Sequence, residues 1–245
     1  MRILIGIDDT DNLTTRGTGF RARQLGERLA GAGIGRVRGI TRHQLFVHPS
    51  IPYTSHNSSA CLDVELETAE LEPARDFCRD YLATESAEGS DAGLCVAHFD
   101  AVPEAVVEFG RSAKTVVLSR DQAHELAAQA RIHLEGVTGE RIGVIGALSA
   151  VGLRRGGNDG RFIWLQGVRE LTGRIAAGRL LETTGIDSVE TTNGQSLPAD
   201  AEVLVDPWPR PVLLKDRAVL LAERCGGGDE YSGWTILSKE AIRRY

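Results

Sequence analysis

Three carboxylates within four residues are the feature of this sequence with the clearest chemistry. They are Asp8, Asp9 and Asp11. Carboxylates held this close together repel one another unless a proton or a cation lies between them. Mg²⁺ is the favoured cation, because it takes carboxylate oxygens and completes its shell with water and substrate phosphates. The spacing predicts a magnesium site at Asp8, Asp9 and Asp11; the alternative is a polar strand end followed by a helix cap.

A threonine between two glycines follows this cluster. Gly17, Thr18 and Gly19 end a polar loop, and a helical pattern with Ala22, Leu25 and Leu29 on one face comes next. A glycine loop that leads into a helix N-terminus offers backbone N–H groups and a positive dipole end to an anion. We therefore expect a phosphate contact at this loop, with a plain turn capped by Thr18 as the alternative.

The stretch before the carboxylates explains how they would be positioned. Residues 3–7 read Ile-Leu-Ile-Gly-Ile, so both faces of a strand here are apolar and the strand is expected to be buried within a sheet. Ligands of open α/β sheets bind where the strands end. The three aspartates are therefore expected at a ligand-binding edge.

A second stretch rich in small residues covers 143–152 and includes Gly146 and Gly152. Its pattern is otherwise helical, and glycine inside a helix costs about 1 kcal/mol relative to alanine. These glycines are thus expected to allow close approach of another backbone or of a ligand. A turn-rich loop with Asp159 follows, and a polar loop at 49–59 is either a pocket wall or an exposed connection.

Composition and charge limit the possible functions. The chain has 245 residues, 42% of them hydrophobic and 25% charged, which is ordinary for a globular protein. There is no apolar run of membrane length and no signal peptide, and the four cysteines form no C-x-x-C pair, so we expect a cytoplasmic protein without a zinc site. Residues 1–60 carry eight arginines against four acids, and 61–110 carry two against thirteen. Residues 141–175 carry six against two, so the two basic segments are the places where a polyphosphate is expected to bind.

The pattern along the chain predicts an α/β (α+β) protein. Strand and helix signals alternate in 61–134 as they would in a ferredoxin-like unit. Beyond 175 the sequence predicts a series of short strands. The expected division is an ATP- and Mg²⁺-binding domain made of 1–60 with 135–180, and a ferredoxin-like and β-rich region made of 61–134 with 181–245.

Several motifs together resemble a known family. Residues 6–11, Gly-Ile-Asp-Asp-Thr-Asp, are similar to the opening motif of the archaeal synthetase that attaches agmatine to the wobble cytidine of an isoleucine tRNA. The resemblance continues in Pro49-x-Ile51-Pro52-Tyr53-Thr54 with Asn57, in Gly146-Ala147-x-x-Ala150-x-Gly152, and in 207–213. Four motifs in the same order are far more specific than one glycine pair.

The resemblance implies a kinase-like domain that binds ATP and Mg²⁺ beside a ferredoxin-like domain. It implies catalytic and metal-binding roles for Asp8, Asp9 and Asp11, and a reactive role for Thr18, with Thr14 and Thr15 as competitors. The residues expected to face ATP are Gly6, Gly17, Thr18, Gly19, Gly146, Gly152 and Asp159. The residues expected to face the substrate are Tyr53, Thr54 and Asn57.

The chain departs from this family in having no recognisable OB-fold or zinc ribbon, the parts that grip tRNA. We therefore expect an ATP- and Mg²⁺-dependent phosphotransferase or ligase related to tRNA modification. Its acceptor would be a small molecule, or RNA supplied by a partner. Two alternatives remain: a nucleotide-binding regulatory module without catalysis, and a phosphohydrolase with Asp9 as nucleophile.

Overall fold

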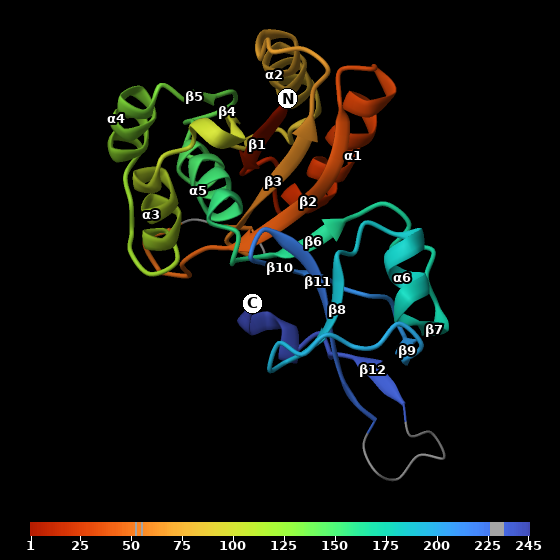
Figure 1. Cartoon of the computed structure of the whole chain (residues 1–245). Coiled ribbons are helices and arrows are strands. Elements are labelled where there is room, and N and C mark those ends of the chain that lie inside the picture. The colour runs from red at the N-terminus through yellow and green to blue at the C-terminus, as the bar shows by residue number, and fades with distance from the viewer. Residues whose placement is uncertain (52, 55, 226–232) are drawn as a thin grey trace. The chain divides into compact units, whose positions relative to one another are not determined.

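The structure is a computed structural model that describes residues 1–51, 53–54, 56–225 and 233–245. The chain forms two compact units, Met1–Gly156 and Gly157–Tyr245. Figure 1 shows the helices and strands of both units.

The first unit begins with a β-α-β-β-α-β arrangement. Its elements are β1 (Arg2–Asp8), α1 (Thr18–Gly31), β2 (Arg36–Gln44), β3 (Ser58–Glu65), α2 (Glu72–Glu85) and β4 (Gly93–His98). The strands lie in the order β4-β1-β3-β2, and every neighbouring pair is antiparallel. This element order and strand order define a ferredoxin-like arrangement.

Strand β1 is the centre of this sheet. It pairs with β3 on one side and with β4 on the other, and Ile3, Leu4 and Ile5 have no exposed surface. Helices α1 and α2 contact one face of the sheet, and α5 (Val144–Gly156) contacts the other (Figure 1). Burial on both faces confirms the reading of residues 3–7 as an internal strand.

Further elements extend this unit. They are η1 (Phe99–Ala101), α3 (Glu104–Ser112), α4 (Arg120–Ala130) and β5 (His133–Gly136). Strand β5 pairs with β4, and both α3 and α4 pack against α5. Helix α4 begins with a capping box, in which Ser119 and Gln122 each bond the other's backbone N–H.

Two expectations need correction here. The ferredoxin-like order occurs at residues 2–98 and not at 61–134, because β3 and β4 pair with β1. For the same reason the compact units do not coincide with the expected division, in which 61–134 was separated from 1–60.

In the described residues, the second unit is a mixed sheet with one α-helix and one short 3₁₀ helix. Its elements are β6 (Arg161–Trp164), β7 (Gly173–Ala176), α6 (Ala177–Thr183), β8 (Ser188–Thr191), β9 (Glu202–Val205), β10 (Val212–Leu214), β11 (Arg217–Arg224), β12 (Trp234–Ile236) and η2 (Ala241–Arg244). The strand order is β6-β10-β11-β12-β9-β7, and β8 pairs with β11 in parallel. Helix α6 is not among the elements predicted from the sequence beyond 175, because seven residues are too few for a clear helical period.

The mixed α/β class predicted from the sequence is confirmed. Among the described residues, no helix is both long enough and apolar enough to cross a membrane.

Candidate metal and phosphate site

Asp8 lies at the end of β1, where the sheet meets the first turn of α5. It pairs with Gly93 of β4, and its side chain lies against Gly146. A Cβ added to Gly146 would come 1.7 Å from Asp8 Oδ2, so any side chain there would force Asp8 to move. Asp8 and the α5 N-terminus are therefore brought together by a glycine that the sequence marked for close approach.

The carboxyl groups of Asp8 and Asp9 are forced into an unfavourable environment. Burial, followed by the charge of Asp9, raises the pKa of Asp8 to about 8. Burial, followed by the charges of Asp91 and Asp11, raises the pKa of Asp9 to about 6. Asp9 also has a positive φ of 53°, which is uncommon for a residue other than glycine. Backbone strain and like charges at one place are typical of functional sites.

Asp11 has a different position from its two neighbours. Its Oδ1 accepts hydrogen bonds from the backbone N and the hydroxyl of Thr18, both 3.0 Å long, and its Oδ2 accepts one of 2.7 Å from the hydroxyl of Thr54. Asp11 therefore occupies the N-terminus of α1 as a carboxylate cap. This is the alternative reading of the cluster, and it holds for this one aspartate.

These contacts decide how a metal ion fits. Within the described part of the chain, no group of three or more His, Cys, Asp or Glu side chains is placed to hold a metal. A three-carboxylate cage is thus not present there, but Mg²⁺ commonly uses only one or two carboxylates together with water and phosphates. Asp8 and Asp9 fit that mode, because a cation between them would relieve the repulsion that raises their pKa values.

A buried hydroxyl lies beside Asp8. The last pair of the antiparallel β1–β3 register is Ile7 with Ala60. The next position on each strand therefore places Ser59 opposite Asp8. Among the described residues, its Oγ is buried without a hydrogen-bond partner. Opposed residues share a face of the sheet, so a ligand held by Asp8 would lie within reach of this oxygen.

Two charged residues of this site were missed in the sequence. Asp91, which precedes β4, raises the pKa of Asp9. Arg42 of β2 donates from Nε to Ser58 Oγ at 2.9 Å; burial lowers its pKa, and the charge of Asp11 opposes that shift. Asp91 belongs to a segment that was read as scaffold, and only the pairing of β4 with β1 places it near Asp9.

Thr18 is buried at the start of α1, and its hydroxyl is hydrogen-bonded on both sides. It donates to Asp11 Oδ1 and lies 3.3 Å from the hydroxyl of Thr10. A hydroxyl next to a carboxylate that can take its proton is the usual arrangement of an activated nucleophile. Thr14 and Thr15 instead lie in an exposed turn, where both bond Asn12.

Gly6 and Gly152 are explained by packing, whereas Gly17 and Gly19 lie at the start of α1. A Cβ on Gly6 would come 2.1 Å from the carbonyl oxygen of Ala147, and one on Gly152 would come 2.1 Å from that of Val106. Gly6 thus lets β1 contact α5, and Gly152 lets α5 contact α3. Gly17 is the N-cap residue of α1, and Gly19 is in its first turn, where its carbonyl accepts a bond from Arg23.

Three other predicted residues have different positions. Tyr53 is 48% exposed, and Asn57 donates to the carbonyl of Phe46 at 2.6 Å, so its amide orders the loop. Asp159 belongs to the second compact unit, whereas the aspartate cluster belongs to the first. The predicted loop also includes Pro52 and Ser55, which lie outside the described residues.

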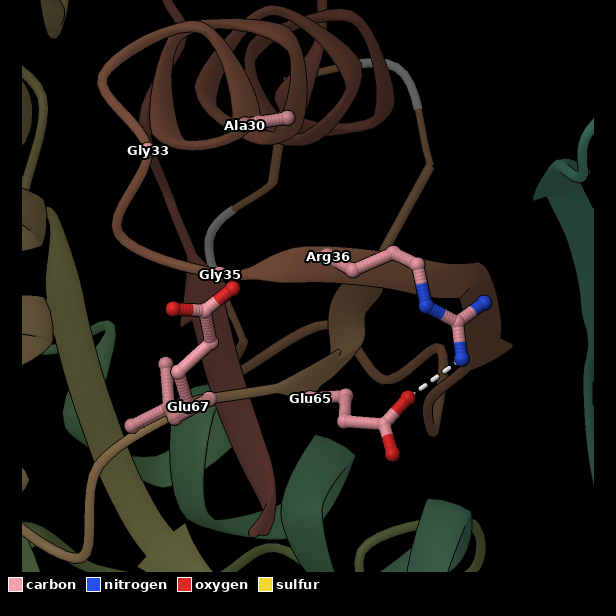
Figure 2. Close-up of a pocket in the computed structure, with 7 residues that line it drawn as sticks. Ala30, Gly33, Gly35, Arg36, Glu65 and Glu67 are labelled. Carbon is pink, nitrogen blue, oxygen red and sulfur yellow. Dashed lines mark hydrogen bonds and ion pairs between the residues drawn. The ribbon is translucent and has the colours of Figure 1, made fainter.

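An open pocket of the first unit lies elsewhere. It has a volume of about 560 Å³ and is lined by residues that include Ala30, Arg36, Glu65 and Glu67. Figure 2 shows the ion pair between Arg36 and Glu65 at its edge. This is the end of the sheet where β1 begins, so the pocket is at the opposite end from the aspartates.

Fold and site together define an α/β protein with paired carboxylates next to two helix N-termini, an arrangement suited to a metal–phosphate ligand. Structures of TiaS, the agmatidine synthetase of an isoleucine tRNA, are similar to part of this chain. In the complex of TiaS with its tRNA and ATP the identity is 27% and the TM-score 0.55, over 62% of this chain and 36% of that one. For apo TiaS the identity is 26% and the TM-score 0.53, over 62% of this chain and 35% of that one. For a tRNA fluorescent labeling enzyme the identity is 28% and the TM-score 0.54, over 62% of this chain and 36% of that one.

The matched region is thus about a third of the length of these enzymes. The resemblance seen in the motifs is confirmed as a partial one. No protein-family model and no curated protein matches the sequence.

Proposed function

We propose that this protein is an ATP- and Mg²⁺-dependent phosphotransferase or ligase-type enzyme whose reaction takes place at the aspartate cluster. The observation that carries the proposal is the adjacent pair Asp8 and Asp9 at the end of β1, with Asp8 held against the first turn of α5. Their pKa values of about 8 and 6 support it, because they reflect carboxyls that a cation would stabilise. The likeness to a structure solved with tRNA and ATP supports a role related to tRNA modification.

Asp8 and Asp9 would hold Mg²⁺, and the ion would neutralise charge on the transferring phosphate. The N-termini of α1 and α5 supply positive dipole ends near the same place, and Arg42 adds a full positive charge. Ser59 offers a buried hydroxyl beside Asp8. Charge stabilisation of this preorganised kind is often the largest contribution to catalysis.

Thr18 and Asp11 are proposed as a second functional pair. The Thr18 hydroxyl donates to Asp11 Oδ1 at 3.0 Å, so the carboxylate is positioned to accept its proton if the oxygen attacks the γ-phosphorus of ATP and displaces ADP. Thr54 holds the other carboxylate oxygen and orients the group. Asp159 and Tyr53, which were also expected to face ATP and substrate, are given no role in this proposal.

The test is Mg²⁺-dependent ATP turnover by the full chain and by the double variant Asp8→Asn, Asp9→Asn. Loss of one preorganised charge-stabilising group typically costs about 10² to 10³ in rate, so turnover should fall by at least that factor. Asp100→Asn is the matched control, because Asp100 is an exposed aspartate of the same unit. Wild-type turnover in the double variant would remove the proposed metal role.

Transfer of label from γ-labelled ATP identifies the nucleophile. Label on Thr18, absent in Thr18→Val and retained in Thr14→Val, is the expected result. Label on Asp9 instead would indicate an aspartyl nucleophile, and ATP binding without any turnover would indicate a regulatory module.

A further inference from the structure

Two arginines of the second unit lie close to the ring of Trp208. The guanidinium carbon of Arg210 is 4.5 Å from the centre of its indole ring, and that of Arg169 is 5.6 Å away. The ring belongs to the connection between β9 and β10, in which Pro207, Pro209 and Pro211 alternate with other residues. Because proline restricts the backbone, this segment holds the half-exposed indole in a defined place.

The ring offers a surface and not a cavity. Trp164, Arg169 and Trp208 line one recess of about 10 Å³, which is room for about one water molecule. A small ligand cannot enter it. A flat group that lies across the indole face needs no cavity, so a planar ring is the kind of ligand that suits this surface.

The two segments that contain Trp208 and its neighbouring arginines carry a net charge opposite in sign to that of the whole protein. Segments 161–174 and 206–211 together carry four arginines (161, 169, 174 and 210) and two acids (Glu170 and Asp206), a net charge of +2. The whole chain carries −6. An anionic chain is therefore attracted to these two segments, although the net charge of the whole protein would repel it.

We propose that Trp208, Arg169 and Arg210 form a stacking site for an unpaired base of single-stranded RNA. A base that stacks on an aromatic ring gains more than an exposed arginine does on the same ring, so the base can replace one guanidinium. The displaced arginine then pairs with a backbone phosphate. The site goes beyond the proposed function and rests on it only in the choice of RNA as the nucleic acid.

The experiment is a fluorescence titration of the full chain with a single-stranded oligoadenylate RNA of about 10 nucleotides, without ATP or Mg²⁺. Stacking on Trp208 quenches indole emission. Trp208→Leu should weaken binding by about tenfold, whereas Trp208→Phe keeps a stacking face and should stay within about threefold. Circular dichroism checks that each variant is folded.

Trp234 provides a matched control, because Arg224 lies 4.2 Å from its ring in the same unit. Trp234→Leu should bind as the wild type does. Arg169→Ala and Arg210→Ala should each lower the slope of log affinity against log salt by about 0.7, and Arg224→Ala should not.

Three outcomes overturn the proposal: no RNA binding by the wild type, equal affinity for Trp208→Leu and the wild type, or equal binding of fully double-stranded RNA. Because the titration contains no ATP, these outcomes are independent of the turnover assay. A Trp208→Leu variant that turns over ATP but has lost RNA affinity would support the stacking site and the catalytic proposal separately.

Discussion

Asp11 receives two hydrogen bonds from Thr18 on one oxygen, one from the backbone N–H and one from the hydroxyl, both 3.0 Å long. This arrangement closes the loop between β1 and α1. It makes Asp11 a structural cap and, in the same geometry, the proton acceptor nearest to the proposed nucleophile. The two roles predict different consequences, and a variant can separate them.

Replacement of Asp11 by alanine should destabilise the protein by about 1 to 2 kcal/mol, the usual effect of losing a helix cap. Urea unfolding at pH 5 is the appropriate measurement, because at that pH Asp8 and Asp9 are largely protonated and the relief of repulsion adds little. Asp11→Asn should restore part of the stability, since the amide oxygen still accepts from Thr18, but should not restore turnover. A stable alanine variant would contradict the capping role.

The raised pKa of Asp8 predicts that stability falls as the pH rises. Its folded pKa of about 8 is above its ordinary value of 3.8. The contribution of the protonated Asp8 to the free energy of unfolding is therefore complete below about pH 4 and is lost as the pH rises through 8. The slope from one proton is at most about 1.4 kcal/mol per pH unit. In the presence of a chelator that removes divalent metal ions, Asp8→Asn should be more stable than the wild type at pH 8.5. At pH 5 the two proteins should have similar stability.

Addition of Mg²⁺ at pH 8.5 supplies the companion measurement. Mg²⁺ should raise the unfolding midpoint of the wild type and leave that of Asp8→Asn, Asp9→Asn unchanged, because a ligand stabilises only the state that binds it. An equal rise in both proteins would mean that the ion binds elsewhere.

The glycines of α5 should respond differently to alanine. Gly146→Ala places a methyl group on the Asp8 carboxylate, and Gly152→Ala places one on the backbone of α3. Both should destabilise the protein by about 1 to 3 kcal/mol through overpacking. Only Gly146→Ala should also remove the pH dependence that comes from Asp8. Gly31→Ala, where nothing lies within 4 Å, should be neutral or stabilising.

A buried ion pair gives the largest expected change. Asp63 is 1% exposed and accepts from Arg154 at 2.5 Å and from Arg2 at 2.8 Å. Asp63→Asn removes the countercharge that Asp63 gives to the buried Arg154, and breaking a buried pair typically costs about 3 to 5 kcal/mol. Glu65→Gln on the same strand breaks an exposed pair with Arg36 and should not change the unfolding midpoint measurably. Similar midpoints for the two variants would contradict the argument from burial.

Local patterns were enough to find the first strand. Strand β1 was recognised because Ile3, Ile5 and Ile7 lie on one apolar face and Leu4 lies on the other. Such signals come from neighbours in sequence, so they are readable without knowledge of the fold.

By itself, the sequence determined the buried first strand, the carboxylates at its end and the positions where glycine permits close approach. Only the tertiary structure decided that Asp11 caps α1, that Asp91 and Arg42 join the cluster, and that β3 and β4 flank β1. The physical reason is that strand register and helix packing bring together residues that are far apart in the sequence. No local periodicity encodes which carboxylate will accept a hydrogen bond from a hydroxyl and which will face another carboxylate.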